Sequence, residues 1–339
     1  MSSSSKTLNT IADEFAAKVI EENRRAKIMK WAPVFVLVAL IIAFTIARGH
    51  DFASINNLVA ILNQLAIPLL IACGLTFVII LGSIDLSIDG TVGMAGSFLS
   101  VLVLNTKNDN DFGVLGWLIA ILGSVAVGYI IGVGHVKLKI PSFMISFGFM
   151  YICKGFAMLS YGGIPAAITD PFLVAVPKDS LLGLPVITCV ALIMFLVTFF
   201  IQEYTPFGRH IFAIGTDESI PRSVGVNVDR VKILVFTYAG LLFGIAGALG
   251  AIRLGQGQMQ IGQDLMFPAQ AAVVVGGTSL AGGKGGVMNT LVGTLIMVVL
   301  DNGLALMGVN PYIKTGIQGV IILVAVALTV SHARKTISK

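Results

Sequence analysis

Long apolar segments, each nearly as long as a bilayer is thick, alternate with short polar segments along most of the chain. A helix crosses the hydrocarbon core with about 20 predominantly apolar residues. We expect spans at approximately 31–47, 58–81, 88–104, 114–136, 140–160, 184–201, 232–252, 265–281, 287–304 and 311–330. Their apolar positions are continuous rather than alternating, which favours helices over a β-barrel. The pattern predicts an all-α polytopic membrane protein with about ten transmembrane helices.

The regions outside and between these spans complete the expected organisation. Residues 1–30 have the pattern of an amphipathic cytoplasmic helix, residues 31–331 form the transmembrane domain, and residues 332–339 form a basic cytoplasmic tail. Glycine, proline or polar residues interrupt the fifth, eighth and ninth spans, so we expect some spans to be broken or re-entrant. Non-helical backbone at membrane depth must be buried in protein or line a wet cavity.

Composition and charge exclude several classes of protein. Hydrophobic residues make up 56% of the chain and charged residues 12%, which rules out a soluble enzyme or a disordered chain. The net charge of +5 indicates no nucleic-acid partner, because cytoplasmic loops of membrane proteins collect Lys and Arg. With the N-terminus inside, the inner segments hold 16 Lys and Arg and the outer segments 5. We therefore expect both termini in the cytoplasm of a multi-pass protein of the bacterial inner membrane.

Polar side chains inside the apolar spans are candidates for a translocation pathway. They are Asn63, Gln64, Lys154, Gln270, Asp301, Asn302 and Gln318. Such residues usually face the bundle interior or a water-filled path, but Asn and Gln serve equally well in hydrogen bonds between helices. For Lys154 and Asp301 we favour the path or an internal pair, because a lone charge in lipid is costly.

A polar turn separates the second and third spans. Two aspartates and one serine, Asp85, Ser87 and Asp89, lie between the apolar runs. We interpret the segment as a turn in which Asp or Ser caps the next helix, and such a turn can also act as a moving gate.

One inner loop, residues 202–231, is far longer than the other inner loops and mixes charges of both signs. Most helix connections are shorter, so we interpret this loop as a docking surface rather than a connector. Its candidate contact residues are Arg209, Glu218, Arg222 and Gly225. Glu218 and Arg222 are four residues apart and share one face of a short helix, unless Pro221 begins that helix.

No catalytic, metal or cofactor motif is recognisable. The glycine-rich segment 276–286 fails as a phosphate loop, because Thr278 stands at its first required glycine and Gly285 follows Lys284 in place of Ser or Thr. We interpret it as a tight turn between the eighth and ninth spans. The chain is therefore expected to have no ATPase site and no cofactor.

Four motifs in order resemble one family. They are Ser83-Ile-Asp-Leu-Ser-Ile-Asp-Gly90, Thr205-Pro-Phe-Gly-Arg-His-Ile-Phe-Ala-Ile-Gly215, Val274-Val-Gly-Gly-Thr-Ser-Leu-Ala-Gly-Gly-Lys-Gly285, and Asp301-Asn-Gly-Leu with Gly308-Val-Asn-Pro-Tyr312. Together they are similar to the permease subunits of bacterial ABC importers for ribose, xylose, arabinose, galactosides and related sugars. The sequence departs from the family pattern at Asp89, at Ser219-Ile-Pro221, at Asp301 and at Gln318.

The resemblance implies a permease subunit that forms the pathway of an ATP-driven importer for a monosaccharide or similar small polar solute. It implies a place in the lipid bilayer and three protein partners: an ATP-binding subunit with Walker motifs, an extracytoplasmic sugar-binding protein, and a second permease copy, identical or paralogous. The alternative is an ion-coupled secondary transporter, for which Asp301 is the candidate coupling carboxylate. A structural membrane protein would need no polar path.

Overall fold

The computed structural model describes residues 31–181 and 183–333, and these residues are mostly helical. The long helices are Trp31–Arg48, α3 (Ile55–Ile80), α4 (Ile88–Leu102), α5 (Gly113–Lys137), α6 (Ser142–Tyr161), α8 (Val186–Tyr204), α9 (Pro206–Thr216), α11 (Val228–Leu254), α12 (Met266–Val275), α13 (Val287–Leu306) and α14 (Pro311–Ala333). The short elements are α2 (His50–Ala53), α7 (Pro171–Ala175), α10 (Ser219–Ser223), the 3-10 helix η1 (Met259–Gly262), β1 (Ala166–Ala167), β2 (Ser180–Leu181), β3 (Leu184–Pro185) and β4 (Gln256–Gly257). The predicted amphipathic segment 1–30 and tail residues 334–339 lie outside the described residues.

Each of the ten predicted spans contains one of these helices, but the described residues include only seven helices long and apolar enough to cross a membrane. The expected count of about ten therefore stays a prediction. α4 has 15 residues and α12 has 10, which is short of the roughly 20 that a full span requires.

The expected interruptions occur in one span of the three. The eighth segment is broken as predicted, since α12 ends at Val275 and the glycine-rich turn follows. The fifth and ninth predictions were wrong, because α6 and α13 each run as one helix of 20 residues. Glycines inside these two helices keep helical geometry, since tertiary packing overrides their weak intrinsic preference.

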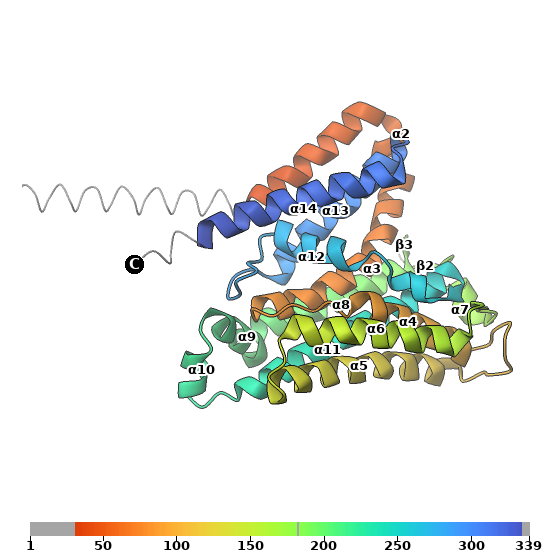
Figure 1. Ribbon diagram of the computed structural model, residues 1–339. Coiled ribbons are helices and arrows are strands. Elements are labelled where there is room, and N and C mark those ends of the chain that lie inside the picture. The colour runs from red at the N-terminus through yellow and green to blue at the C-terminus, as the bar shows by residue number, and fades with distance from the viewer. Residues whose placement is uncertain (1–30, 182, 334–339) are drawn as a thin grey trace, which may run out of the picture.

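The centre of the bundle is α11, which packs against both α3 and α4, and these three helices hold most of the residues of the main apolar core (Figure 1). α5 packs along α11, where Gly128 and Gly240 face each other. A Cβ atom added at Gly240 would lie 3.2 Å from the Cα of Gly128. Small residues of this kind let two membrane helices approach closely.

The bundle has two distinct ends, which α11 joins. α9 and α10 lie at one end, and α7, β2 and β3 lie at the other (Figure 1). α11 begins at Val228, just after α10, and ends at Leu254, where the chain turns into β4. β4 pairs antiparallel with β1 at the end away from α9, so one helix connects the charged loop to the region described next.

Candidate functional site

Two adjoining cavities open beside α3 near the C-terminal end of α11. The first measures about 420 Å³ and the second about 480 Å³, within the range of small-molecule sites. Four residues line both cavities: Gln64, Pro68, Arg253 and Leu265. η1 and the segment before it complete the first cavity, whereas α13 and α14 contribute to the second. Both lie among helices that the sequence assigns to the membrane.

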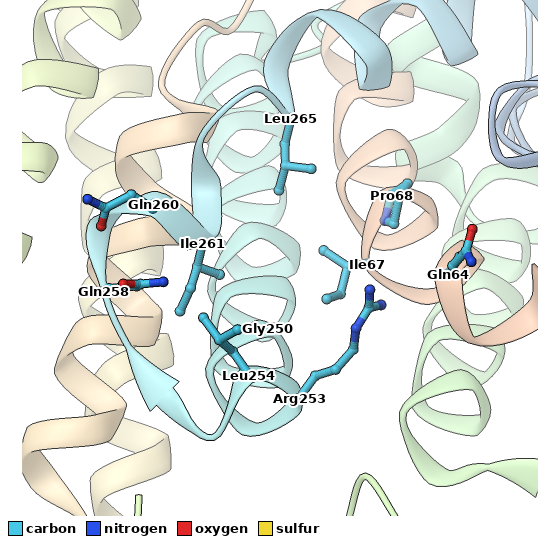
Figure 2. Close-up of a pocket in the computed structure, with 10 residues that line it drawn as sticks. All are labelled: Gln64, Ile67, Pro68, Gly250, Arg253, Leu254, Gln258, Gln260, Ile261 and Leu265. Atoms are coloured by element: carbon cyan, nitrogen blue, oxygen red, sulfur yellow. The ribbon is translucent and has the colours of Figure 1, made fainter. Parts of the chain in front are cut away.

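Arg253 provides the only cation in the linings of these two cavities. It occupies the last turn of α11, which Gly255 ends in the left-handed conformation with φ 73°. Its Nη1 donates to the carbonyl of Asn63 at 3.3 Å, and its side chain points towards Ile67 and Pro68 on α3 (Figure 2). Pro68 has no N–H to bond the carbonyl one turn earlier, so α3 presents a free backbone acceptor beside the cavity.

A polar cluster between α13 and α14 borders the second cavity. Lys314 Nζ lies 2.8 Å from Asp301 Oδ1, and Gln318 Nε2 donates to the same oxygen at 3.3 Å. Asp301 and Gln318 both line the cavity, together with Gln64, Gln263, Asp264 and Thr294. The carboxylate of Asp301 thus receives its counter-charge from the chain itself.

The polar turn before α4 connects three helices. Asp85 is buried, and its Oδ1 accepts from the backbone N–H of Ser87 at 2.8 Å. The predicted cap of the next helix was wrong, because Ser87 stands at the N-cap of α4 without a side-chain bond. Asp89 Oδ1 instead accepts from the N–H of Met266 at 3.1 Å, at the start of α12. This carboxylate therefore ties α4 to α12.

Lys154 on α6 approaches the same carboxylate. Its Nζ lies 3.9 Å from Asp89 Oδ2, and its side chain is 25% exposed. Gln270 on α12 donates to the carbonyl of Asp85 at 3.2 Å. Polar groups at membrane depth are commonly paired within the bundle in this way, so this cluster holds α4, α6 and α12 together.

At the opposite end, α9 packs closely against the end of α3. Thr205 caps α9 by accepting from the N–H of Gly208 at 3.3 Å, and Pro206 occupies its first turn. A Cβ atom at Gly215 would overlap the carbonyl oxygen of Ile80. Any other residue at 215 would therefore push α9 away from α3.

The glycine-rich turn 276–286, which we call the glycine turn, is held between α3, α8 and α9. The N–H of Gly283 donates to Ile80 O at 2.8 Å, and Gln202 Oε1 accepts from the N–H of Val287 at 2.7 Å. Gly277, Gly282 and Gly285 have positive φ angles, a conformation that non-glycine residues rarely adopt. The glycine turn therefore touches α9 at Gly215 and also continues directly from the end of α12, so it links these two helices.

The charges of the long loop are joined in one network. Arg222 Nη2 lies 2.7 Å from Glu218 Oε1 and 3.3 Å from Asp229 Oδ1, and Lys232 pairs with Glu218. The hydrogen bond from Lys232 and the neighbouring Arg222 lower the pKa of the Glu218 carboxyl below its usual range. α10 begins at Ser219, so Pro221 does not start it. A proline in a first turn removes no needed donor, and Glu218 and Arg222 share one face, as the spacing predicted.

The remaining loop candidates are exposed. Arg209 lies on the outer side of α9 and Gly225 in the turn after α10. Gly225 has φ +84° with no heavy atom within 4 Å of an added Cβ. Any other residue there would be strained by its backbone conformation rather than by crowding.

The predicted pathway residues therefore divide into two groups. Gln64, Asp301 and Gln318 line the cavities. Neither lining contains the other four candidates, Asn63, Lys154, Gln270 and Asn302. The backbone carbonyl of Asn63 accepts from Arg253, and Asn302 is buried. Lys154 pairs with Asp89, and Gln270 donates to the carbonyl of Asp85. A helix-facing side chain and a cavity-facing one look alike in a sequence.

Sequence reasoning missed Arg253, Gln258, Gln260, Gln263 and Asp264. The expected spans 232–252 and 265–281 place these residues in an outer loop. The available signal was the succession of four glutamines between 256 and 263 directly after a long apolar helix, since irregular backbone at membrane depth is either buried in protein or lines a wet cavity.

Comparison with known proteins gives consistent relatives. Residues 57–326 match the family model described as branched-chain amino acid transport system / permease component. The chain is 34% identical over 298 residues to the ribose import permease protein RbsC of Haemophilus influenzae, covering 86% of this chain and 90% of the relative. It is 32% identical over 323 residues to the galactose/methyl galactoside import permease protein MglC of Escherichia coli K12, covering 91% and 96%. No solved structure matches.

Proposed function

The chain belongs to the family of branched-chain amino acid transport system permease components, and from that premise we propose that it forms the pathway of an ATP-driven importer for a monosaccharide. As a multi-pass permease subunit it has no ATPase site of its own, and it acts with ATP-binding and substrate-binding partners. The observation that carries the proposal is the pair of polar cavities among membrane helices. The sugar class follows the names of the relatives.

The proposed assembly contains a second permease copy, an ATP-binding subunit at the α9–α10 end and an extracytoplasmic sugar-binding protein at the other end. The surplus of Lys and Arg in the predicted inner segments supports this orientation, with both termini in the cytoplasm. The helix inside each of ten apolar segments supports a ten-span topology in which α4 and α12 enter the membrane only partly. Reporter tags at residues 1 and 339 should both be cytoplasmic, and one near Asn108 should be external. An external C-terminus would contradict the even span number.

Within the pathway, we assign direct contact with the solute to Gln64, Asp301 and Gln318, together with Arg253. Asn63, Lys154, Gln270 and Asn302 support the wall around it. Asp85, Ser87 and Asp89 form the gate, because their turn joins α4 to α12 and to Lys154. Movement of α12 would change the bonds at this turn and thus the width of the adjoining cavity.

The coupling surface in this proposal is the segment from α9 to α10, with Arg209, Glu218, Arg222 and Gly225. Work done by the ATP-binding subunit on α9 would reach α12 through the glycine turn, since α9, Ile80 and Gly283 are in contact. Packed elements of this kind shift as units rather than deform continuously.

The ion-coupled alternative has less support. Its candidate carboxylate, Asp301, is paired with Lys314 and Gln318, so the position of a coupling cation is taken by an ammonium group. A gradient-driven transporter needs a carboxylate that binds and releases its ion during each cycle.

Reconstitution tests the proposal directly. The chain, co-expressed with its ATP-binding and sugar-binding partner subunits, is placed in proteoliposomes, and uptake of radiolabelled D-ribose and D-galactose is measured. Uptake should require internal ATP and should persist when proton and sodium gradients are collapsed. Uptake that survives without ATP but stops when the gradients collapse would favour the ion-coupled alternative.

A further inference from the structure

Arg253 has free hydrogen-bond donors inside the first cavity (Figure 2). Across the described ranges 31–181 and 183–333 it forms no ion pair, and its one hydrogen bond is to the neutral carbonyl of Asn63 at 3.3 Å. A guanidinium carries five N–H donors in a planar fork. Most of these donors are thus available to a molecule in the cavity.

The surroundings of Arg253 indicate what kind of molecule this is. Gln64, Gln258 and Gln260 border the first cavity and offer amide donors and acceptors. Neither cavity lining contains an aromatic residue, so no ring surface is available for stacking. Recognition in these cavities must therefore come from hydrogen bonds to polar groups of the solute.

The charges favour a neutral solute. Asp264 in the second cavity opposes the charge of Arg253, and Lys314 neutralises Asp301. An anionic solute would be held by Arg253 in a charge-assisted, bidentate pair and would then face Asp264 as it moved on. Passage through a membrane protein requires binding weak enough to be released.

We propose that Arg253 reads a pair of adjacent hydroxyl groups on a neutral sugar and is the specificity-determining residue of the pathway. The two parallel N–H groups of its fork match two oxygens on neighbouring carbons, which a lysine ammonium does not. Gln258 directs its amide into the same cavity (Figure 2) and bonds a further hydroxyl. This inference rests on the proposed function and adds the chemistry that the permease itself selects.

The test compares a sugar with an analogue that lacks one hydroxyl of the pair. ATP-driven uptake of D-ribose and 2-deoxy-D-ribose, and of D-galactose and 2-deoxy-D-galactose, is measured in proteoliposomes at saturating sugar-binding protein. Under this condition the maximal rate reports the permease. Arg253→Gln should lower the maximal rate for the complete sugar about tenfold, as loss of a charge-assisted hydrogen-bond pair implies, and by much less for the deoxy analogue.

Three comparisons make the test specific. Arg253→Lys keeps the charge without the fork and should recover only part of the rate. Arg48→Gln is the matched control, since Arg48 donates to the carbonyl of Leu306 outside both cavities, and it should leave the rate ratio unchanged. The sugar concentration at half-maximal uptake should stay constant, because the binding protein sets it.

The outcomes separate this inference from the proposed function. If the unmodified protein transports these sugars but Arg253→Gln keeps the same ratio of complete to deoxy sugar, the inference is wrong. If Arg253→Lys transports the complete sugar at the wild-type rate and the unmodified protein also takes up D-glucuronate, the hydroxyl-pair inference is wrong and Arg253 belongs to an anion site. If the unmodified protein transports neither sugar with ATP, the proposed function fails for these sugars and the inference with it. If Arg253→Gln does not assemble, Gln258→Leu is used in its place, and the ratio of the maximal rates for the complete and the deoxy sugar is measured again.

Discussion

The two ends of α11 hold arginines in opposite circumstances. Before its N-terminus, Arg222 is paired with Glu218 and also reaches Asp229, although water could solvate all three groups. In its last turn, Arg253 meets only a neutral carbonyl, although it lies among helices assigned to the membrane. Both arginines are exposed, but the one before α11 is held in ion pairs, whereas the one in its last turn has no ion-pair partner among the described residues.

This difference teaches what each end is built to do. Exposed ion pairs contribute only about 0–1 kcal/mol to stability, so the network around Glu218 chiefly fixes the orientation of α10. The guanidinium of Arg253 has no ion-pair partner among the described residues and lines both cavities, so its donors face the space in which we propose that the solute binds. The proposed protein contact therefore lies at one end of α11 and the proposed solute site at the other.

The largest effect is expected where α9 meets α3. In Gly215→Ala the new methyl group would overlap the carbonyl of Ile80, so α9 must shift. Overpacking of this kind costs about 1–3 kcal/mol, and sugar uptake per ATP hydrolysed should fall about tenfold. Gly148→Ala is the control, because a Cβ there has no heavy atom within 4 Å. Full coupling in Gly215→Ala would show that α9 carries no transport motion.

A smaller effect is expected from Arg222→Glu. The reversal places three carboxylates together in place of the present pairs, which turns α10 without disturbing the membrane helices. Co-purification with the ATP-binding subunit and uptake per ATP should fall severalfold, while the melting temperature changes little. Arg230→Glu, at an exposed position in the same region, is the matched reversal. If co-purification and uptake per ATP both survive in Arg222→Glu and after deletion of 217–223, the loop is only a connector.

At the cavity end, the pair between Asp301 and Lys314 offers a milder test. Lys314→Met leaves the half-exposed Asp301 carboxylate without its counter-charge, which should lower stability by about 1 kcal/mol after allowance for solvent. Lys314→Met with Asp301→Asn should recover most of the loss, because no lone charge remains. Thermal unfolding of the detergent-purified protein measures both. Equal loss in the single and double variants would mean that packing, rather than charge, joins α13 to α14.

The smallest effect concerns pH. Because Lys232 lowers the pKa of Glu218, the stabilising contribution of this group is present above its unfolded pKa, about 4.3. It is lost as pH falls through the lower folded value. Acidification below about pH 4 should therefore release α10 in the native protein and have little further effect in Glu218→Gln. The release of α10 is measured as limited proteolysis within residues 217–227. Equal cleavage of both proteins at low pH would mean that the charge of Glu218 does not hold α10 in place.

Much of the fold was predictable because its signals are local. Apolar length marked the helices, and turn chemistry marked the segments around Gly82 and Gly277. The four-residue spacing of Glu218 and Arg222 predicted their shared face. The lengths of α4 and α12 were not predictable, since the polar turn before α4 and the glycine turn after α12 look like span ends of any kind.

Amino-acid sequence by itself determined which segments enter the membrane, where the charged loop lies, and that the chain carries no recognisable nucleotide motif, because these depend on composition and short-range spacing. Only the tertiary structure decided that Gln64, Arg253 and Asp301 line one cavity while Lys154 pairs with Asp89. These residues are separated by scores of positions along the chain. Burial and pairing at membrane depth depend on which helices pack together, and that packing is settled over the whole bundle at once.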